Sequence, residues 1–147
     1  MKRKIAAIIL ATVVVASAAA DGIDKKFAAL FKAFPDSKFT MMVIPVSGSF
    51  ISNKIIVASL KAGTDSKPSQ EIASILQAAV PTQLAVSGDN DAVAAATLQR
   101  ALSSLKGKSL PPHELAFIGD KEYEPALSSA AAEVGIKLTY IPFPNFE

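Results

Sequence analysis

The sequence predicts an α/β fold, a three-layer α/β/α sandwich built around a mostly parallel five-stranded sheet. Two patterns predict it. From residue 64 onward, stretches with apolar residues at helical spacing alternate with short apolar runs of strand length. In addition, the run Leu115–Ile118 is apolar at every position, which is typical of a strand covered by helices on both faces.

The region before residue 64 predicts one helix and a β-hairpin. Apolar residues at helical spacing form one stripe: Ile23, Phe27, Leu30, Phe31 and Phe34. Extended runs follow at 39–46 and 53–60, and the segment Ser47–Ser49 between them is rich in turn residues. Pro45 has no N–H to donate, so the first strand is expected at a sheet edge, antiparallel to its neighbour.

Three helix–strand pairs are expected to complete the domain. Helical stripes cover 72–80, 94–105 and 127–134, with Asp65 or Ser66 as the cap of the first, and strands are expected at 84–86, 115–118 and 136–143. Strand–helix–strand connections of this length are right-handed and join parallel strands. We therefore expect the last four strands to be parallel, with helices on both faces of the sheet.

This order of elements resembles small Rossmann-like and flavodoxin-like domains at the level of the fold. A resemblance of that kind implies an architecture and no particular activity, because such folds carry many unrelated functions.

The first twenty residues have the layout of a secretory signal peptide. Lys2, Arg3 and Lys4 precede an apolar run from Ile5 to Ala16, and small residues follow up to Ala20. The run is shorter than the roughly 20 residues that a membrane-spanning helix needs. We expect cleavage after Ala20, a single domain over 21–147, no stable membrane anchor after cleavage, and a periplasmic or secreted product.

Charge and cysteine content narrow the function classes. The chain has 15 basic and 13 acidic residues, and three of the basic ones belong to the expected signal peptide. No clustered cationic face remains, so nucleic-acid binding is not expected. The chain has no cysteine, which excludes disulfides, lipid attachment through cysteine, thiolate metal sites and cysteine nucleophiles.

Aspartates follow three of the expected elements. In parallel sheets ligands bind at the carboxyl ends of strands, near a point where the winding direction reverses. This rule selects the loops 61–65, 87–91 and 119–121, and the candidate ligand-binding residues in them are Asp65, Ser87, Asp89, Asn90, Asp91 and Asp120.

These residues have two interpretations. Asp89, Asp91 and Asp120 can supply oxygen ligands to Mg²⁺ or Ca²⁺, or their carboxylates can receive the amine of a small ligand. Alternatively, each aspartate caps the helix that follows it, which the capping preference of Asp favours.

Recognised catalytic patterns are missing from the sequence. It contains no G-x-G-x-x-G or G-x-x-x-x-G-K-[ST] motif for phosphate and no G-x-S-x-G elbow for a serine hydrolase. His113 is the only histidine, and its position in the Pro111–Pro112 loop predicts a solvent-exposed side chain.

The leading hypothesis is a small exported binding or interaction protein that is not an enzyme, whose oligomeric state the sequence leaves open. One alternative is a domain that binds a divalent metal or a small ligand and that could act as an enzyme. The other is a structural subunit of an exported assembly. A protein partner in the cell envelope or outside the cell would meet apolar residues at the hairpin tip and in the C-terminal tail, namely Phe50, Ile51, Phe143 and Phe146.

Overall fold

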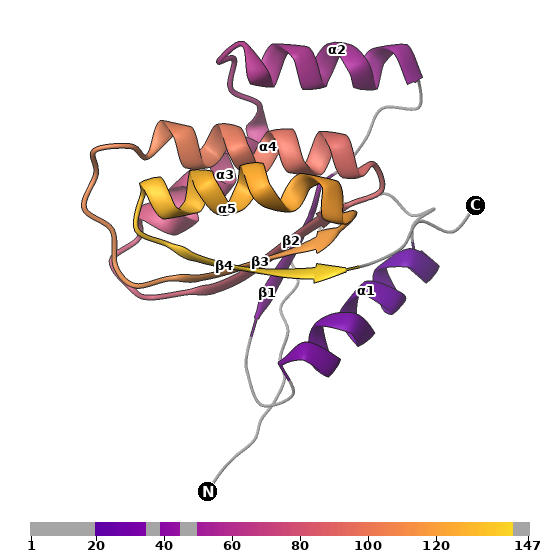
Figure 1. Cartoon of the computed structure of the whole chain (residues 1–147), viewed down its shortest axis with the longest axis horizontal. Helices are drawn as coiled ribbons and strands as arrows, with labels where there is room; N and C mark the ends of the chain where they lie inside the picture. The colour runs from indigo at the N-terminus through magenta and orange to yellow at the C-terminus, as the bar shows by residue number, and fades with distance from the viewer. Residues whose placement is uncertain (1–19, 35–38, 45–49, 143–147) are drawn as a thin grey trace, which may run out of the picture.

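The computed structural model describes residues 20–34, 39–44 and 50–142, and its elements confirm an α/β fold (Figure 1). Its sheet contains four strands: β1 (Thr40–Ile44), β2 (Gln83–Gly88), β3 (Glu114–Gly119) and β4 (Lys137–Pro142). They lie side by side in chain order, and every neighbouring pair is parallel.

The predicted hairpin is wrong. Residues 50–61 form helix α2 (Phe50–Lys61), and β1 pairs in parallel with β2, from Thr40 opposite Leu84 to Ile44 opposite Gly88. A short run rich in β-branched residues fits a strand or a helix equally well in sequence. Here Ile56, Val57 and Leu60 share the inner face of the helix, whereas a strand would place Ile56 and Val57 on opposite faces. The described sheet therefore has four parallel strands, in place of five with an antiparallel border.

One face of the sheet is covered by helix α1 (Ala20–Ala33) (Figure 1). Leu30 of this helix is buried, and the strand residues of the same core cluster are Met41, Val43, Ala85, Ala116, Ile118 and Ile141. Phe34 packs against Phe39 in a tilted arrangement, with ring centroids 4.8 Å apart. Phe31, which the helical stripe also placed inside, is 40% exposed, and the side chains of Ile23 and Phe27 lie outside the described ones.

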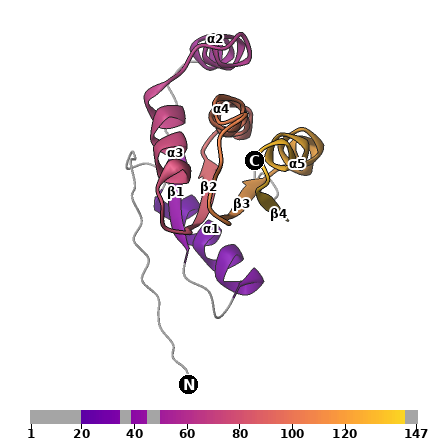
Figure 2. The ribbon, with the colours of Figure 1, turned by 90° about the vertical axis from the view of Figure 1, so that its left-hand side faces the viewer.

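The opposite face is covered by three helices, α3 (Lys67–Gln77), α4 (Asp91–Ser104) and α5 (Glu124–Glu133) (Figures 1 and 2). Each crossover shifts by one strand in the same direction, so right-handed connections bring their helices to a common face. Phe117, Leu84 and Leu98 are fully buried in this larger core. In the described sheet the winding direction does not reverse. The reversal point at which the sequence analysis expected ligands to bind is therefore missing from the described strands.

Helix α2 does not take part in covering the sheet. It lies on α4, which separates it from the strands in both views (Figures 1 and 2). The connection from β1 to β2 thus contains two helices, of which α3 packs on the sheet and α2 forms an additional outer layer.

Some sequence-based expectations fall outside the described residues. The expected signal peptide, apart from Ala20, is among them, as are Pro45, Phe143 and Phe146. None of the helices in the described ranges combines the length and the apolar character needed to cross a bilayer.

Candidate functional site

The ends of β2 and β3 bring two of the predicted aspartates together. Asp91 is the first residue of α4, directly beyond β2, and its carboxylate reaches across to the end of β3. There its Oδ2 accepts a hydrogen bond of 2.8 Å from the backbone N–H of Asp120. One carboxylate therefore connects the turns that follow two neighbouring strands, and we call this region the acidic edge.

Glycines at both strand ends make this close approach possible. A Cβ built on Gly119 would lie 3.2 Å from Cγ of Asp91 and 2.8 Å from the ring of Phe117. A Cβ on Gly88 would lie 3.0 Å from the carbonyl oxygen of Ile44. A side chain at Gly119 would force its neighbours to shift, and one at Gly88 would be tightly packed against β1, so glycine at both positions allows the elements to lie close together.

The helix-cap interpretation is correct for some of the polar residues. Asn90 is the N-cap of α4, and its Oδ1 accepts from the N–H of Val93 at 3.0 Å. Asp120 caps the 3₁₀ helix η2 (Lys121–Tyr123) and accepts from the N–H of Glu122 at 3.0 Å. Asp91 is not the cap of α4, and Asp89 is exposed. Capping therefore accounts for Asn90 and Asp120 and leaves the carboxylates of Asp89 and Asp91 for other interactions.

A buried lysine from the opposite face completes the acidic edge. Lys26 of α1 is 7% exposed, and its ammonium donates a hydrogen bond to the carbonyl of Gly88. Burial lowers the pKa of Lys26 more than the nearby charges of Asp91 and Asp89 raise it. Sequence reasoning missed this residue, although Lys26 stands four positions before Leu30 and thus on the same side of the helix.

The ionisable groups around Asp91 are perturbed by burial. Desolvation raises the pKa of Asp91, and the charges of Asp120 and Glu122 add to this, against the opposing effects of the Asp120 N–H and Lys26. Burial, together with Glu122, raises the pKa of Tyr123 to about 12. Burial and the charge of Asp120 also raise the pKa of Tyr140, whose hydroxyl donates to the carbonyl of Gly119 at 2.7 Å.

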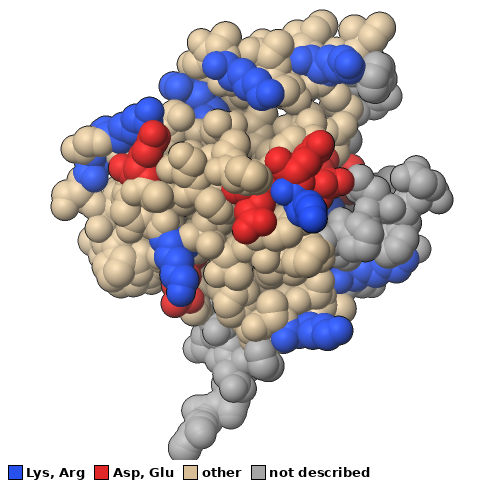
Figure 3. All heavy atoms as spheres, viewed as in Figure 1, with Lys and Arg blue, Asp and Glu red and all other residues tan. Residues whose placement is uncertain are grey.

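The acidic edge carries more negative than positive charge. The carboxylates that influence Lys26, Asp91 and the two tyrosines are those of Asp89, Asp91, Asp120, Glu122 and Glu124. Figure 3 shows acidic atoms gathered where α5 begins, near the carboxyl ends of the strands, with basic atoms beside them. Among the described residues, the cation whose charge acts on Asp91 is Lys26, which is buried beneath the edge.

Two predicted site residues lie apart from this cluster. Asp65 precedes α3, after helix α2 and not after a strand, and its Oδ1 pairs with Nε of Arg100 on α4 at 2.6 Å. Ser87 lies in β2, but its side chain is fully buried, and its Oγ is the only buried side-chain oxygen or nitrogen of the described residues without a hydrogen-bond partner.

The described residues do not assemble a metal site. Across residues 20–34, 39–44 and 50–142, no group of three or more His, Cys, Asp or Glu side chains is placed to hold a metal ion. Asp89, Asp91 and Asp120 are all within these ranges, so the three aspartates do not converge as a ligand set.

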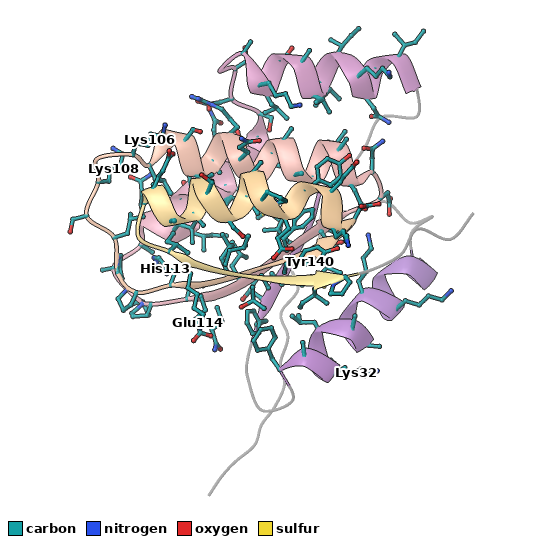
Figure 4. The ribbon with its side chains drawn as sticks, viewed as in Figure 1. Lys32, Lys106, Lys108, His113, Glu114 and Tyr140 are labelled. Atoms are coloured by element: carbon teal, nitrogen blue, oxygen red, sulfur yellow. The ribbon has the colours of Figure 1, made fainter. Side chains whose placement is uncertain are left out.

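His113 is buried, contrary to the solvent-exposed side chain that the sequence predicts. It is 3% exposed and lies toward the end of the sheet opposite Tyr140 (Figure 4). Its Nδ1 accepts from the N–H of Thr82 at 3.0 Å, and its Nε2 is 2.7 Å from the carbonyl oxygen of Leu76. The imidazole therefore joins the end of α3 to the start of β2, far from the acidic edge.

The predicted partner contacts are only partly described. Ile51 is 68% exposed on α2, whereas Phe50 is described in its backbone alone, and Phe143 and Phe146 lie outside the described residues.

Comparisons with known proteins give no match. Neither the protein-family models, nor the curated proteins, nor the solved structures contain one that matches this chain. The function therefore has to be inferred from the acidic edge itself.

Proposed function

We propose that this chain is an exported, non-enzymatic binding protein whose ligand is a small organic cation with a primary ammonium group. The ligand would bind at the acidic edge, between the ends of β2 and β3. The observation that carries the proposal is the half-buried carboxylate of Asp91, which lies near the like charges of Asp120 and Glu122 and near the buried Lys26.

The electrostatics favour a cation over an anion. Burial is the main cause of the raised pKa of Asp91, and the charges of Asp120 and Glu122 add to it, so its negative charge is disfavoured where it stands. A ligand ammonium would offset this repulsion and donate hydrogen bonds to carboxylate oxygens, which are the stronger kind. A phosphate at the start of α4 would instead meet Asp89 and Asp91.

The number and arrangement of the available oxygen ligands favour an ammonium group over a metal ion. A divalent metal requires several converging oxygen ligands, and the described carboxylates do not converge in this way. An ammonium group needs only two or three acceptors at hydrogen-bond distance and tolerates a spread arrangement. The acidic edge offers such acceptors on Asp91 and on the neighbouring exposed Asp89 and Glu122.

Export is the second part of the proposal, and its support is the sequence of residues 1–20. Cleavage after Ala20 would leave Lys26 and Leu30 of α1 in the mature chain.

Calorimetric titration with putrescine, at low salt, tests the proposed ligand class. We expect the parent chain to release heat and Asp91→Asn to weaken binding by about tenfold or more, since a charge-assisted hydrogen bond is lost. The amide oxygen introduced by this substitution can still accept from the N–H of Asp120, so the turn is preserved. Glu133→Gln is the matched control, because Glu133 pairs with Lys106 at the far end of α5.

Two results would contradict the proposal. One is the absence of heat with putrescine, and the other is equal binding by the Asp91→Asn and Glu133→Gln variants. Parallel titrations with Mg²⁺ and Ca²⁺ test the metal alternative, and heat with these ions alone would replace the organic cation with a metal.

A further inference from the structure

The outer face of α2 is an exposed apolar and basic surface. Its exposed residues recur at helical spacing and are Ile51, Lys54, Ile55, Ala58 and Lys61. Ile51 is 68% exposed and Ile55 60%, and they lie one helical turn apart. We use "the outer face of α2" for these five residues.

The position of α2 gives this surface no role in the fold. The inner face of the helix packs Ile56, Val57 and Leu60 toward the core, and α3 already covers the sheet in the same crossover. The outer face is directed away from α4 and the sheet in both ribbon views (Figures 1 and 2). Two exposed isoleucines one turn apart, flanked by lysines, form an apolar surface with a polar rim that is available for contact.

The charge of α2 restricts what can cover it. The helix contains two lysines and no acidic residue. Figure 3 shows blue atoms along this layer among tan ones. A second copy of the same face would bring lysines against lysines, so the complementary surface is anionic.

The size of the face separates a lipid surface from a protein. A helix of 12 residues is about 18 Å long and about 10 Å wide, so the footprint of its outer face is roughly 200 Å². A stable protein interface uses about 800 Å² on each partner. An anionic membrane has no such minimum, because apolar side chains insert singly while lysines meet the headgroups.

We propose that the outer face of α2 docks reversibly on an anionic lipid surface. Ile51 and Ile55 enter the boundary between headgroups and acyl chains, and Lys54 and Lys61 lie at the level of the headgroups. The proposal is independent of the acidic edge, which lies at the carboxyl ends of the strands.

The lack of cysteine permits a site-specific test. An environment-sensitive fluorophore is attached to Ile51→Cys, and in a second sample to Val80→Cys, whose parent side chain is exposed to the same extent at 69% but lies after α3. Vesicles of phosphatidylglycerol and phosphatidylcholine are compared with vesicles of phosphatidylcholine alone. We expect a blue shift for position 51 with the anionic vesicles only, and none for position 80.

The lysines are tested in the labelled Ile51→Cys chain. Lys54→Gln with Lys61→Gln should weaken vesicle binding by about tenfold or more, since each lysine near an anionic surface contributes. Lys106→Gln with Lys108→Gln removes the same charge from the loop after α4 and should leave binding unchanged (Figure 4).

Three outcomes would overturn the proposal. The first is that a fluorophore at position 51 does not respond to anionic vesicles. The second is that positions 51 and 80 respond alike, which is the result expected if the chain binds vesicles through residues 1–20. The third is a response of position 51 to a synthetic amphipathic Glu/Leu helix but not to vesicles, which would identify an acidic protein segment as the partner.

Discussion

Asp91 is the central residue of the candidate site. Its carboxylate stabilises the turn after β3 by accepting a hydrogen bond from the N–H of Asp120. Burial and the like charges nearby oppose the ionisation of the same carboxylate. A structural aspartate at the start of a helix would normally be favoured in its charged form by the helix dipole. The pKa of Asp91 shifts in the opposite direction, because burial and the charges of Asp120 and Glu122 disfavour its ionised form.

This direction predicts how stability depends on pH. The pKa of Asp91 is raised in the folded chain, so the protonated carboxyl stabilises the fold. That contribution is complete at acid pH, below the ordinary carboxyl pKa, and is lost as the pH rises through the raised value.

We therefore expect Asp91→Asn to raise the free energy of unfolding at about pH 7, where the parent carboxylate is charged, and to make no difference at about pH 3. Urea unfolding at both pH values, without added ligand, measures this, with Glu133→Gln for comparison. A variant that is less stable than the parent at neutral pH would show that Asp91 is there for structure.

At the scale of the elements, the junction between α3 and β2 is held by a side chain, because His113 makes hydrogen bonds with backbone groups of both segments. The carbonyl of Leu76 lies in the last turn of α3, where helix carbonyls lack partners within the helix. His113 contacts it, and also accepts from Thr82 just before β2. Because Nδ1 accepts from a backbone N–H, the ring proton belongs on Nε2.

Replacement of His113 should therefore be costly. His113→Ala leaves the buried carbonyl of Leu76 and the partly buried N–H of Thr82 without their partner and opens a cavity, so we expect a loss of about 2–4 kcal/mol in the free energy of unfolding. His113→Asn and His113→Gln each restore one of the two hydrogen bonds and should lose less. Urea unfolding of the three variants tests this, and an alanine variant within about 0.5 kcal/mol of the parent would refute it.

Prediction from sequence succeeded for the elements with strong periodicity and clear caps. Helix α3 has Ser66 as its cap, with reciprocal hydrogen bonds to Ser69, and β3 is buried from Leu115 onward as its unbroken apolar run indicated. The run 53–60 was misassigned because its pattern is compatible with both periods. Contact with α4 decides between them, and that contact is not visible in a local window of sequence.

At the scale of the whole molecule, the two faces of the sheet are covered unequally. Three helices pack on one face, while α1 covers the other, where the central strands present the small residues Ala85 and Ala116. Helix α1 also contributes Lys26 to the acidic edge. The docking of this helix thus links the stability of the smaller core to the geometry of the candidate site.

Two neighbouring substitutions test how α1 sits on the sheet. Leu30 is 2% exposed and Phe31 40%, so Leu30→Ala should cost about 2–4 kcal/mol in the free energy of unfolding and Phe31→Ala clearly less. Thermal and urea unfolding of both variants give the comparison. Equal losses, or a larger loss for Phe31→Ala, would mean that the helix presents a different face to the strands.

The candidate site could be predicted only in part. Asp91 and Asp120 meet because they follow adjacent parallel strands. The alternation of helices and strands implied that these strands are parallel, but it left the strand order open, and the tertiary structure makes them neighbours. Asp65 was misplaced because it follows a helix where a strand had been predicted, and Lys26 was missed because it lies 62 residues from its partner Gly88.

The sequence by itself determined the α/β class, the parallel direction of β2, β3 and β4, and the glycine and aspartate turns after β2 and β3, because periodicity, caps and turn residues act over a few neighbouring positions. The tertiary structure alone decided that residues 50–61 are helical, that Lys26 lies beneath the acidic edge and that His113 is buried. Each of these three features depends on contacts between segments that are distant in the chain. Packing against those segments outweighs the local preference of the residues for a helix or a strand.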